Sequence, residues 1–205
     1  AYNEPMLGKY GLVVGCLFVA QVGFASYDLS LIPQLANHKI NRFDPVTGVN
    51  LGSFNVANPE NLTLDQSHSR VFVSHSASTR IRSYDYNLGS FLETYELLVT
   101  PAQSVYHAGS NSLFCLTTTG VVKRLNLTNG AITDISGIAG ITYKTIALSG
   151  DAVIATGTNT SNFINTFSFN ALTLAMTDNF SLGYAVAPNT RLGKSILINR
   201  GTYLN

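Results

Sequence analysis

Charged residues are scarce in this chain. They make up 11% of its 205 residues, less than half of the roughly 25% that is usual for a soluble domain. The net charge is +1, and the longest basic cluster is Lys123-Arg124. Because phosphate binding needs several convergent cations, the sequence predicts no nucleic-acid partner. The polar surface must come from Ser, Thr, Asn and Gly, which is typical of virion and extracellular proteins.

Cysteine is almost absent as well. Cys16 and Cys115 are too few for a disulfide framework or a zinc site. Both lie inside apolar runs, where a free cysteine behaves as a small hydrophobic residue, so we expect two buried, reduced thiols. No run of 18 apolar residues occurs, so the sequence predicts no transmembrane span.

The apolar segment from Gly11 to Ala25 has two interpretations. It follows Lys9 and ends in a passable cleavage site, which are features of a signal peptide. However, the apolar part before Cys16 is short, and Glu4 and Pro5 do not suit a positively charged leader. We therefore expect residues 11–22 to form paired strands rather than a cleaved leader.

A repeat of apolar strands runs through the sequence. The strand centres are roughly 40 residues apart, after a longer first interval, which is the spacing of four-stranded propeller blades. The strands are short and rich in β-branched or aromatic residues, as buried strands are. Their centres are Phe18, Phe72, Phe114, Val153 and Ile196.

A second column of strands follows the first. In each, an aliphatic residue precedes an aromatic residue or Leu by three positions, and Asp, Asn or Ser comes next. Glycine-containing turns follow three of them, because Gly adopts positive φ without steric cost. The turn after the fourth, at residues 170–172, lacks Gly and is expected to be looser. The strands are Ile40–Asp44, Ile81–Asp85, Val122–Asn126 and Ile164–Ser168.

These columns predict an all-β fold, a β-propeller of four-stranded antiparallel blades. About four blades are complete and a fifth is partial, with at least sixteen strands and essentially no helix outside residues 23–37. One blade cannot bury both faces of its sheet, so the blades form a single domain over residues 1–205. The predicted blade boundaries are 5–56, 57–99, 102–139, 143–182 and 183–205.

The segment Ile40–Phe54 has the pattern Ile-x-x-Phe-Asp-x-x-Thr-Gly-x-x-x-Gly-x-Phe, echoed at Ile81–Phe91. It resembles the blades of NHL-type and quinoprotein-like bacterial propellers. Those families include binding proteins, cell-surface proteins, and a few lyases and dehydrogenases, so the resemblance implies a fold and not an activity. Quinoprotein enzymes need a Trp-rich cofactor cradle, and this chain has no Trp.

No residues form a recognisable catalytic or metal site, and we expect neither enzyme activity nor a cofactor. The four histidines, His38, His68, His75 and His107, have no metal-binding spacing. His68 and His75 flank one strand near Asp65, where short polar residues usually form turns. Asp44 and Asp85 recur at equivalent positions and should cap turns, while Glu93 and Glu96 lie on opposite strand faces, which disfavours a paired acid–base role.

One segment departs from the repeat. Residues 23–37 form an insertion between the second and third strands of the first blade, which explains the long first interval. Apolar residues at this density usually mark a contact surface, although a loop folded back onto the propeller is the alternative. The predicted partner-binding residues are Phe24, Tyr27, Leu29, Leu31, Ile32 and Leu35.

Residues 183–205 supply only two strands of the fifth blade, Tyr184–Ala187 and Ser195–Asn199. An unfinished blade leaves unpaired backbone groups, so we expect the ring to be completed by more chain or by another subunit. The sequence thus favours a structural module docking onto protein subunits of a larger assembly, such as a virion accessory, tail or surface component. The alternative is a secreted or cell-surface propeller that binds a carbohydrate or small molecule, possibly as a lyase.

Overall fold

The computed structural model describes residues 29–161 and 163–185. Within them, fifteen strands form four sheets, and every strand pairing is antiparallel. This confirms the predicted all-β propeller-like architecture. The expected strands in residues 11–22 and 195–199 lie outside the described residues.

The first sheet has three strands in the described part of the chain, and the other three sheets have four each. The first sheet contains β1 (Ser30–Gln34), β2 (Lys39–Phe43) and β3 (Asn50–Asn55). The second contains β4 (Pro59–Asp65), β5 (Arg70–His75), β6 (Arg80–Asp85) and β7 (Phe91–Glu96). The third contains β8 (Pro101–His107), β9 (Ser112–Thr117), β10 (Val122–Asn126) and β11 (Ile132–Ile135). The fourth contains β12 (Thr142–Ser149), β13 (Ala152–Thr158), β14 (Phe163–Asn170) and β15 (Met176–Ala185).

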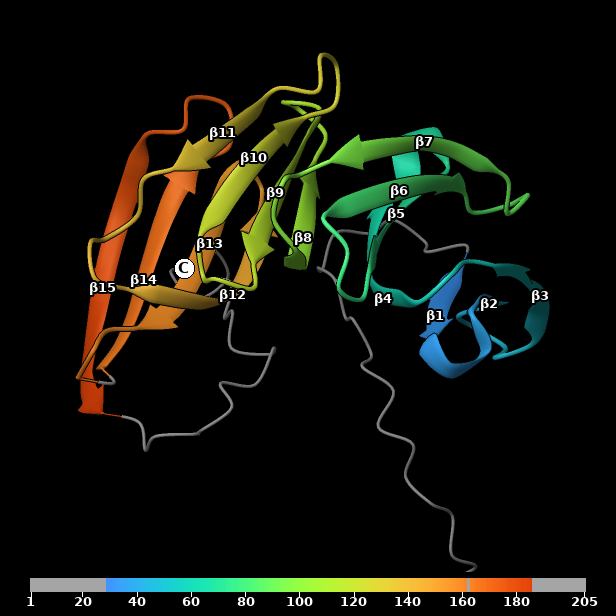
Figure 1. Ribbon diagram of the computed structural model, residues 1–205, viewed down its shortest axis with the longest axis horizontal. Helices are drawn as coiled ribbons and strands as arrows, with labels where there is room; N and C mark the ends of the chain where they lie inside the picture. Colours follow the sequence, from blue (N-terminus) through green and yellow to red (C-terminus); the bar gives the residue numbers. More distant parts are fainter. Residues whose placement is uncertain (1–28, 162, 186–205) are drawn as a thin grey trace, which may run out of the picture.

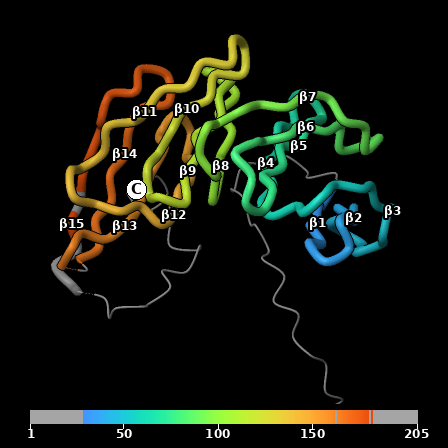
Figure 2. Tube along the Cα trace, viewed as in Figure 1, coloured from blue at the N-terminus to red at the C-terminus, as the bar shows by residue number. Residues whose placement is uncertain are grey.

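The sheets follow one another in an arc, as Figures 1 and 2 show. The strands β4, β8 and β12 lie side by side along its inner edge, and β1 lies beside β4. Two 3-10 turns, η1 (Leu35–Asn37) and η2 (Gln66–His68), each precede a residue with positive φ, His38 and Ser69. Helical structure in the described residues is confined to these short turns, close to the near-absence that the sequence predicts.

Each sheet has a front face toward the preceding sheet in chain order and a back face toward the following one. The strand β9 shows how the sequence fills both faces, because all six of its residues are buried. Leu113 and Cys115 lie on the front face and pack against the second sheet, and Phe114 and Leu116 lie on the back face and pack against the fourth. A continuous apolar run is therefore a strand buried on both sides.

Three hydrophobic clusters fill the spaces between successive sheets. Between the first and second sheets, Ile40 and Phe54 meet Val71, Val73 and Tyr84. Burial raises the pKa of the Cys115 thiol, between the second and third sheets, to about 12, which agrees with the expected inert, reduced state. Cys16 lies outside the described residues.

Polar side chains join the inner strands. Asn61 Nδ2 donates to the carbonyl of Ala102 at 2.7 Å, and Thr63 Oγ1 donates to the carbonyl of Ser104 at 2.9 Å. Gln103 Oε1 accepts from the backbone N–H of Ile146 at 3.1 Å. These bonds satisfy buried polar groups where the inner strands lie side by side.

The turn between the last two strands is built in a similar way in all four described sheets. In the first sheet, Asp44 Oδ1 accepts from the N–H groups of Val46 and Thr47, both at 2.8 Å. These bonds hold the pKa of Asp44 below its usual value. Asp85 makes the equivalent bonds, as predicted for a turn-capping residue.

The predicted register of the fourth repeat is wrong. Asn170, not Ser168, takes the position of Asp85, and its Oδ1 accepts from the N–H groups of Leu172 and Thr173. This turn is not looser than the others, since Leu174 adopts φ 62° where the other sheets have Gly. Leu174 packs against the core, which offsets the cost of a left-handed conformation.

Two further strand assignments from the sequence are wrong. Ser30–Gln34 is a strand paired with β2, not part of an inserted loop, and it takes the position that the sequence analysis gave to residues 17–20. Leu31 packs on the core beside Ile40, which explains the apolar character of this segment. Tyr184 and Ala185 continue β15 instead of starting a fifth blade.

Candidate functional site

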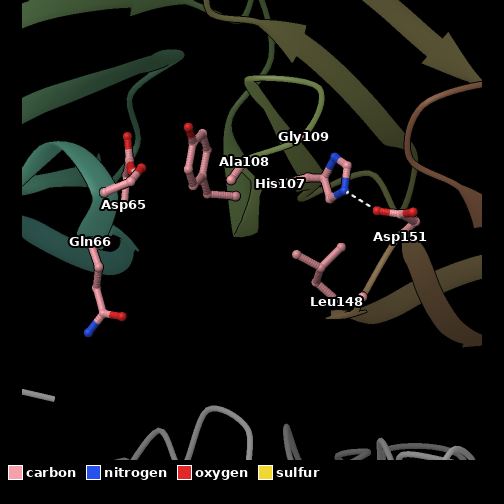
Figure 3. A pocket seen from close by; sticks show the side chains of 10 residues that line it. Asp65, Gln66, His107, Ala108, Gly109, Leu148 and Asp151 are labelled. Carbon is pink, nitrogen blue, oxygen red and sulfur yellow. Dashed lines mark hydrogen bonds and ion pairs between the residues drawn. The ribbon is translucent and has the colours of Figure 1, made fainter. Parts of the chain in front are cut away.

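The loops that join the first and second strands of the second, third and fourth sheets come together on one face of the arc, at the ends of the inner strands β4, β8 and β12. They surround an open depression of about 380 Å³, seen in Figure 3. Asp65, Gln66 and Ser67 line it on one side, and Leu148, Gly150 and Asp151 on the other. Tyr106 and His107 lie between them at the end of β8.

Asp65 is the most enclosed carboxylate of this region, with a fully buried side chain. It accepts hydrogen bonds from Ser67 Oγ at 2.6 Å and Arg70 Nη2 at 2.8 Å, and its Oδ2 lies 2.9 Å from His68 Nδ1. Burial alone would raise the pKa of Asp65, but the bonds from Ser67, Arg70 and His68 hold it below its usual value. A carboxylate this well bound is a structural anchor and not a free base.

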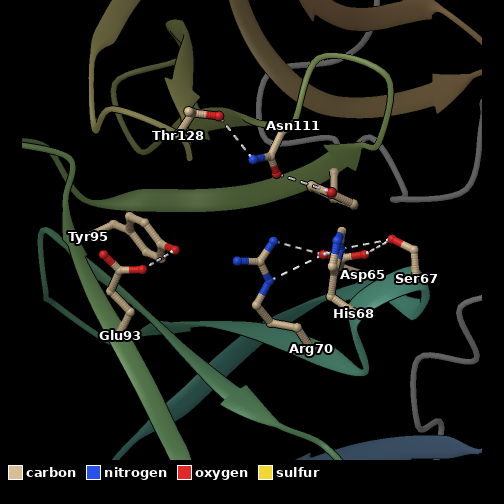
Figure 4. Close-up of polar contacts among 9 residues, drawn as sticks. Asp65, Ser67, His68, Arg70, Glu93, Tyr95, Asn111 and Thr128 are labelled. Carbon is tan, nitrogen blue, oxygen red and sulfur yellow. Dashed lines mark hydrogen bonds and ion pairs between the residues drawn. The ribbon is translucent and has the colours of Figure 1, made fainter.

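Arg70 extends this network between the second and third sheets. Its guanidinium lies over the rings of Phe72, at 4.6 Å from the centroid, and Tyr106, at 6.0 Å. Figure 4 shows it between Asp65 and the pair formed by Tyr95 and Glu93. Burial, with the hydrogen bond to Glu93, raises the pKa of Tyr95 to about 12, so this phenol stays protonated.

His107 connects the third sheet to the fourth. Its Nδ1 accepts from the backbone N–H of Ser110 at 3.1 Å, so the neutral ring carries its proton on Nε2, which donates to Asp151 Oδ1 at 2.9 Å. Ser110 Oγ lies 2.9 Å from the same Nδ1. Ser110, His107 and Asp151 are the residue types of a Ser-His-Asp catalytic triad. A local turn nevertheless accounts for the contact between Ser110 and His107, since the two residues are three positions apart and the backbone N–H of Ser110 also binds the ring.

The remaining histidines with defined contacts also serve the fold. His75 is buried, and its Nδ1–H donates to the carbonyl of Ala57 at 2.5 Å. Burial lowers the pKa of His75, and the nearby Arg82 lowers it further. His38 Nδ1 accepts from the backbone N–H of Asn58 at 3.2 Å. Among the residues that the structure describes, no group of three His, Cys, Asp or Glu side chains could hold a metal ion.

The six predicted partner-binding residues do not form one exposed surface in the described part of the chain. Phe24 and Tyr27 lie outside the described residues. Leu31 faces the core and Leu29 is half-buried, while Ile32 and Leu35 are 45% and 49% exposed. Ile32 shares the front face of the first sheet with Phe43 and Leu51, two residues that the sequence analysis did not single out.

The front face of the first sheet carries the residue types that the other sheets use for packing. Ile32 takes the position of Val73, and Phe43 that of Tyr84. Val73 is 0% and Tyr84 is 6% exposed because both pack on the first sheet, whereas Ile32 is 45% exposed and Phe43 is half-buried. Within residues 29–161 and 163–185, no core cluster includes this face.

Comparison with known proteins identifies the fold alone. No protein-family model matches the chain, and no curated protein matches it by sequence. Hydrazine synthase from Kuenenia stuttgartiensis is similar in structure, with a TM-score of 0.61 and 11% identity over 76% of this chain and 46% of that one. The Cps50 (Swd1) β-propeller domain of Myceliophteria thermophila gives a TM-score of 0.61 and 10% identity, covering 78% of this chain and 54% of its own.

BamB from Moraxella catarrhalis gives a TM-score of 0.58 and 13% identity, covering 83% of this chain and 49% of its own. The chain thus spans about half the length of these structures. The β-propeller architecture is confirmed, although the comparisons identify no sequence family. Among the described residues, no helix is long and apolar enough to cross a membrane.

Proposed function

We propose that this chain is a non-enzymatic β-propeller module that docks onto other protein subunits of a larger assembly, such as a virion accessory, tail or surface component. The observation that carries the proposal is the front face of the first sheet. Ile32 and Phe43 take the positions of the buried Val73 and Tyr84, yet Ile32 is 45% exposed and Phe43 is half-buried. Leu51, beside them, is 46% exposed. Exposed apolar faces of this kind are typical of protein contact sites.

The polar groups support a structural role instead of catalysis. Asp65 is bound by three side chains, and His107 is held between Ser110 and Asp151. Because Asp65 and His107 already make several short hydrogen bonds within the protein, a change in their protonation would disrupt contacts that hold neighbouring elements together, which favours a structural role. The resemblance of Ile40–Phe54 to NHL-type blades agrees with a binding role, because such blades commonly present interaction surfaces.

The docking proposal predicts the behaviour of a front-face variant. Ile32→Asp together with Leu51→Asp places two carboxylates on the apolar face and should release the chain from its assembly. Size fractionation of extracts from the natural source should find the tagged wild type in a high-mass fraction and this variant at the mass of the single chain.

Leu98→Asp is the matched control. Leu98 is 74% exposed after β7, away from the front face, and its φ of 67° is one that Asp tolerates. This control should stay in the high-mass fraction. A wild-type chain that always migrates alone would contradict the docking proposal.

A second candidate function is binding of a carbohydrate or small molecule in the depression between the loops. Asp151, whose side chain is 62% exposed, and the neighbouring Gln66 and Ser67 offer hydrogen-bonding groups for hydroxyls. This function requires a soluble monomer whose melting temperature rises with added saccharide. Docking requires instead a chain that is insensitive to saccharides.

A further inference from the structure

The two terminal faces of the arc are of opposite kinds. Each interior interface joins the back face of one sheet to the front face of the next. The first sheet offers a front face, and the fourth offers a back face. A contact between the front face of one copy and the back face of another joins two different surfaces and is therefore heterologous. Repeated contacts of this kind give either a closed ring or an open filament.

The back face of the fourth sheet has a composition that suits such a contact. Ile154 takes the position of Phe72, and Thr156 and Ser168 those of Ser74 and Ser83. The equivalent face of the second sheet carries the buried Ser74 and Ser83 among larger apolar residues, Phe72, Ile81 and Tyr95, and it packs against the third sheet. Small hydroxyl side chains at these positions are therefore compatible with burial between two sheets, and Ile154 adds an apolar contact at the position of Phe72.

The hydroxyl groups of Thr156, Thr166 and Ser168, on the back face of the fourth sheet, are already paired within the sheet. Thr156 and Thr166 share a hydrogen bond of 2.9 Å between their hydroxyls, and Ser168 bonds Thr177 at 2.8 Å. Covering this face would leave no new unpaired hydroxyl from these residues, which removes the main cost of burying them. The front face of the first sheet adds Asn41 and Ser53 beside its apolar residues.

We propose that the occupant of the front face of the first sheet is the back face of the fourth sheet of a second copy of this chain. This inference rests on the docking function proposed above and names its partner. In two copies related by a two-fold axis, the front face of each first sheet covers the back face of the other copy's fourth sheet. The four described sheets of each copy then form one ring of eight. Propellers of four to eight blades are the usual range, so the curvature of such a ring is ordinary.

The experiment uses two variants of the full chain, each blocking one face. Ile32→Asp blocks the front face and Thr166→Asp blocks the back face. In sedimentation equilibrium the wild type should have twice the single-chain mass of 22.0 kDa. Each variant alone should have the single-chain mass.

An equimolar mixture of the two variants tests the pairing directly. The unblocked front face of the Thr166→Asp chain can meet the unblocked back face of the Ile32→Asp chain, so dimers should reappear in the mixture. Recovery also shows that both variants are folded. Leu98→Asp should remain dimeric, which controls for added charge.

Three results would overturn the inference. A wild type that stays monomeric shows that a second copy is not the occupant. Loss of dimers with Ile32→Asp but not with Thr166→Asp indicates front-to-front pairing. Large polymers in the wild type indicate an open filament instead of a two-copy ring. In each case the docking function stands if the front-face variant still leaves the high-mass fraction of the natural source.

Discussion

Gly157→Ala should destabilise the protein by about 3 kcal/mol or more, among the largest effects expected of a single methyl group. A Cβ at this position would lie 2.2 Å from the carbonyl oxygen of Thr142 and 2.6 Å from Cα of Tyr143. Both are backbone atoms of the neighbouring strand β12, so no side chain can move aside. The pairing of β12 with β13 is irregular at Tyr143, which brings the two backbones close at Gly157.

Thermal unfolding followed by circular dichroism measures this effect. For a chain of this size, a loss of 3 kcal/mol lowers the melting temperature by roughly 6–12 °C. Gly130→Ala is the control, because a Cβ there meets nothing within 4 Å and only the φ of 71° is unfavourable. It should cost about 1–2 kcal/mol. Equal losses in the two variants would contradict the close approach of β12 and β13.

Asp65→Asn should destabilise the protein by about 3–5 kcal/mol, because it leaves the Arg70 guanidinium without its carboxylate. The Arg70 side chain is only 17% exposed and lies against two aromatic rings, so water cannot replace the lost partner. Urea denaturation at neutral pH measures the loss. Adding Arg70→Met to Asp65→Asn should recover part of the stability by removing the unpaired charge.

Asp134→Asn is the matched control for charge removal. Asp134 pairs with Lys123, but its side chain is 69% exposed. Exposed ion pairs contribute about 0–1 kcal/mol, so this variant should unfold close to the wild type. A loss at Asp134 as large as that at Asp65 would contradict the buried network.

The same network gives an acid sensitivity of known sign. The pKa of Asp65 is lower in the folded protein than the usual aspartate value of 3.8, because Ser67, Arg70 and His68 bind the carboxylate. Its contribution to stability is therefore present above that value and is lost as the pH falls through the folded pKa. Removing the carboxylate with Asp65→Asn should remove this part of the acid dependence.

The sequence was most informative where structure depends on neighbouring residues. Asp85 and the segment Asn87-Leu88-Gly89 predict a tight turn, and the turn forms because the Asp85 side chain reaches the backbone N–H groups two and three residues away. The buried strands around Phe72 and Phe114 were also predicted, because a run of apolar residues signals burial on both faces. These local signals were enough for the fold class.

The sequence was less informative where the pairing of strands determines the structure. The long first interval of the repeat predicts an insertion that includes residues 30–34, and Pro33, which has no N–H, adds no strand signal there. Pairing with β2 and packing of Leu31 on the core make them a strand. In the fourth repeat, Ile164–Ser168 fits the repeat pattern, and the hydrogen bonds of Asn170 show that the strand runs two residues further before the turn.

The candidate site shows the same limit. Asp65 and His68 were expected to form a turn, and both take part in the turn that starts at η2. His107 and Asp151 are 44 residues apart, and no local pattern links them; their contact exists because two sheets are adjacent. The equivalent positions of Asp65 and His107, each at the end of an inner strand, were the one available signal.

The central claim is that the front face of the first sheet is a protein contact surface. Hydrogen exchange measured by mass spectrometry tests it most directly, by comparing the dilute single chain with the same chain in its native assembly. We predict slower exchange in the assembly for the backbone of β1, β2 and β3, with little change in β11, at the outer edge of the third sheet. Unchanged exchange throughout the first sheet, with protection confined to the loops around Asp65 and Asp151, would contradict the claim.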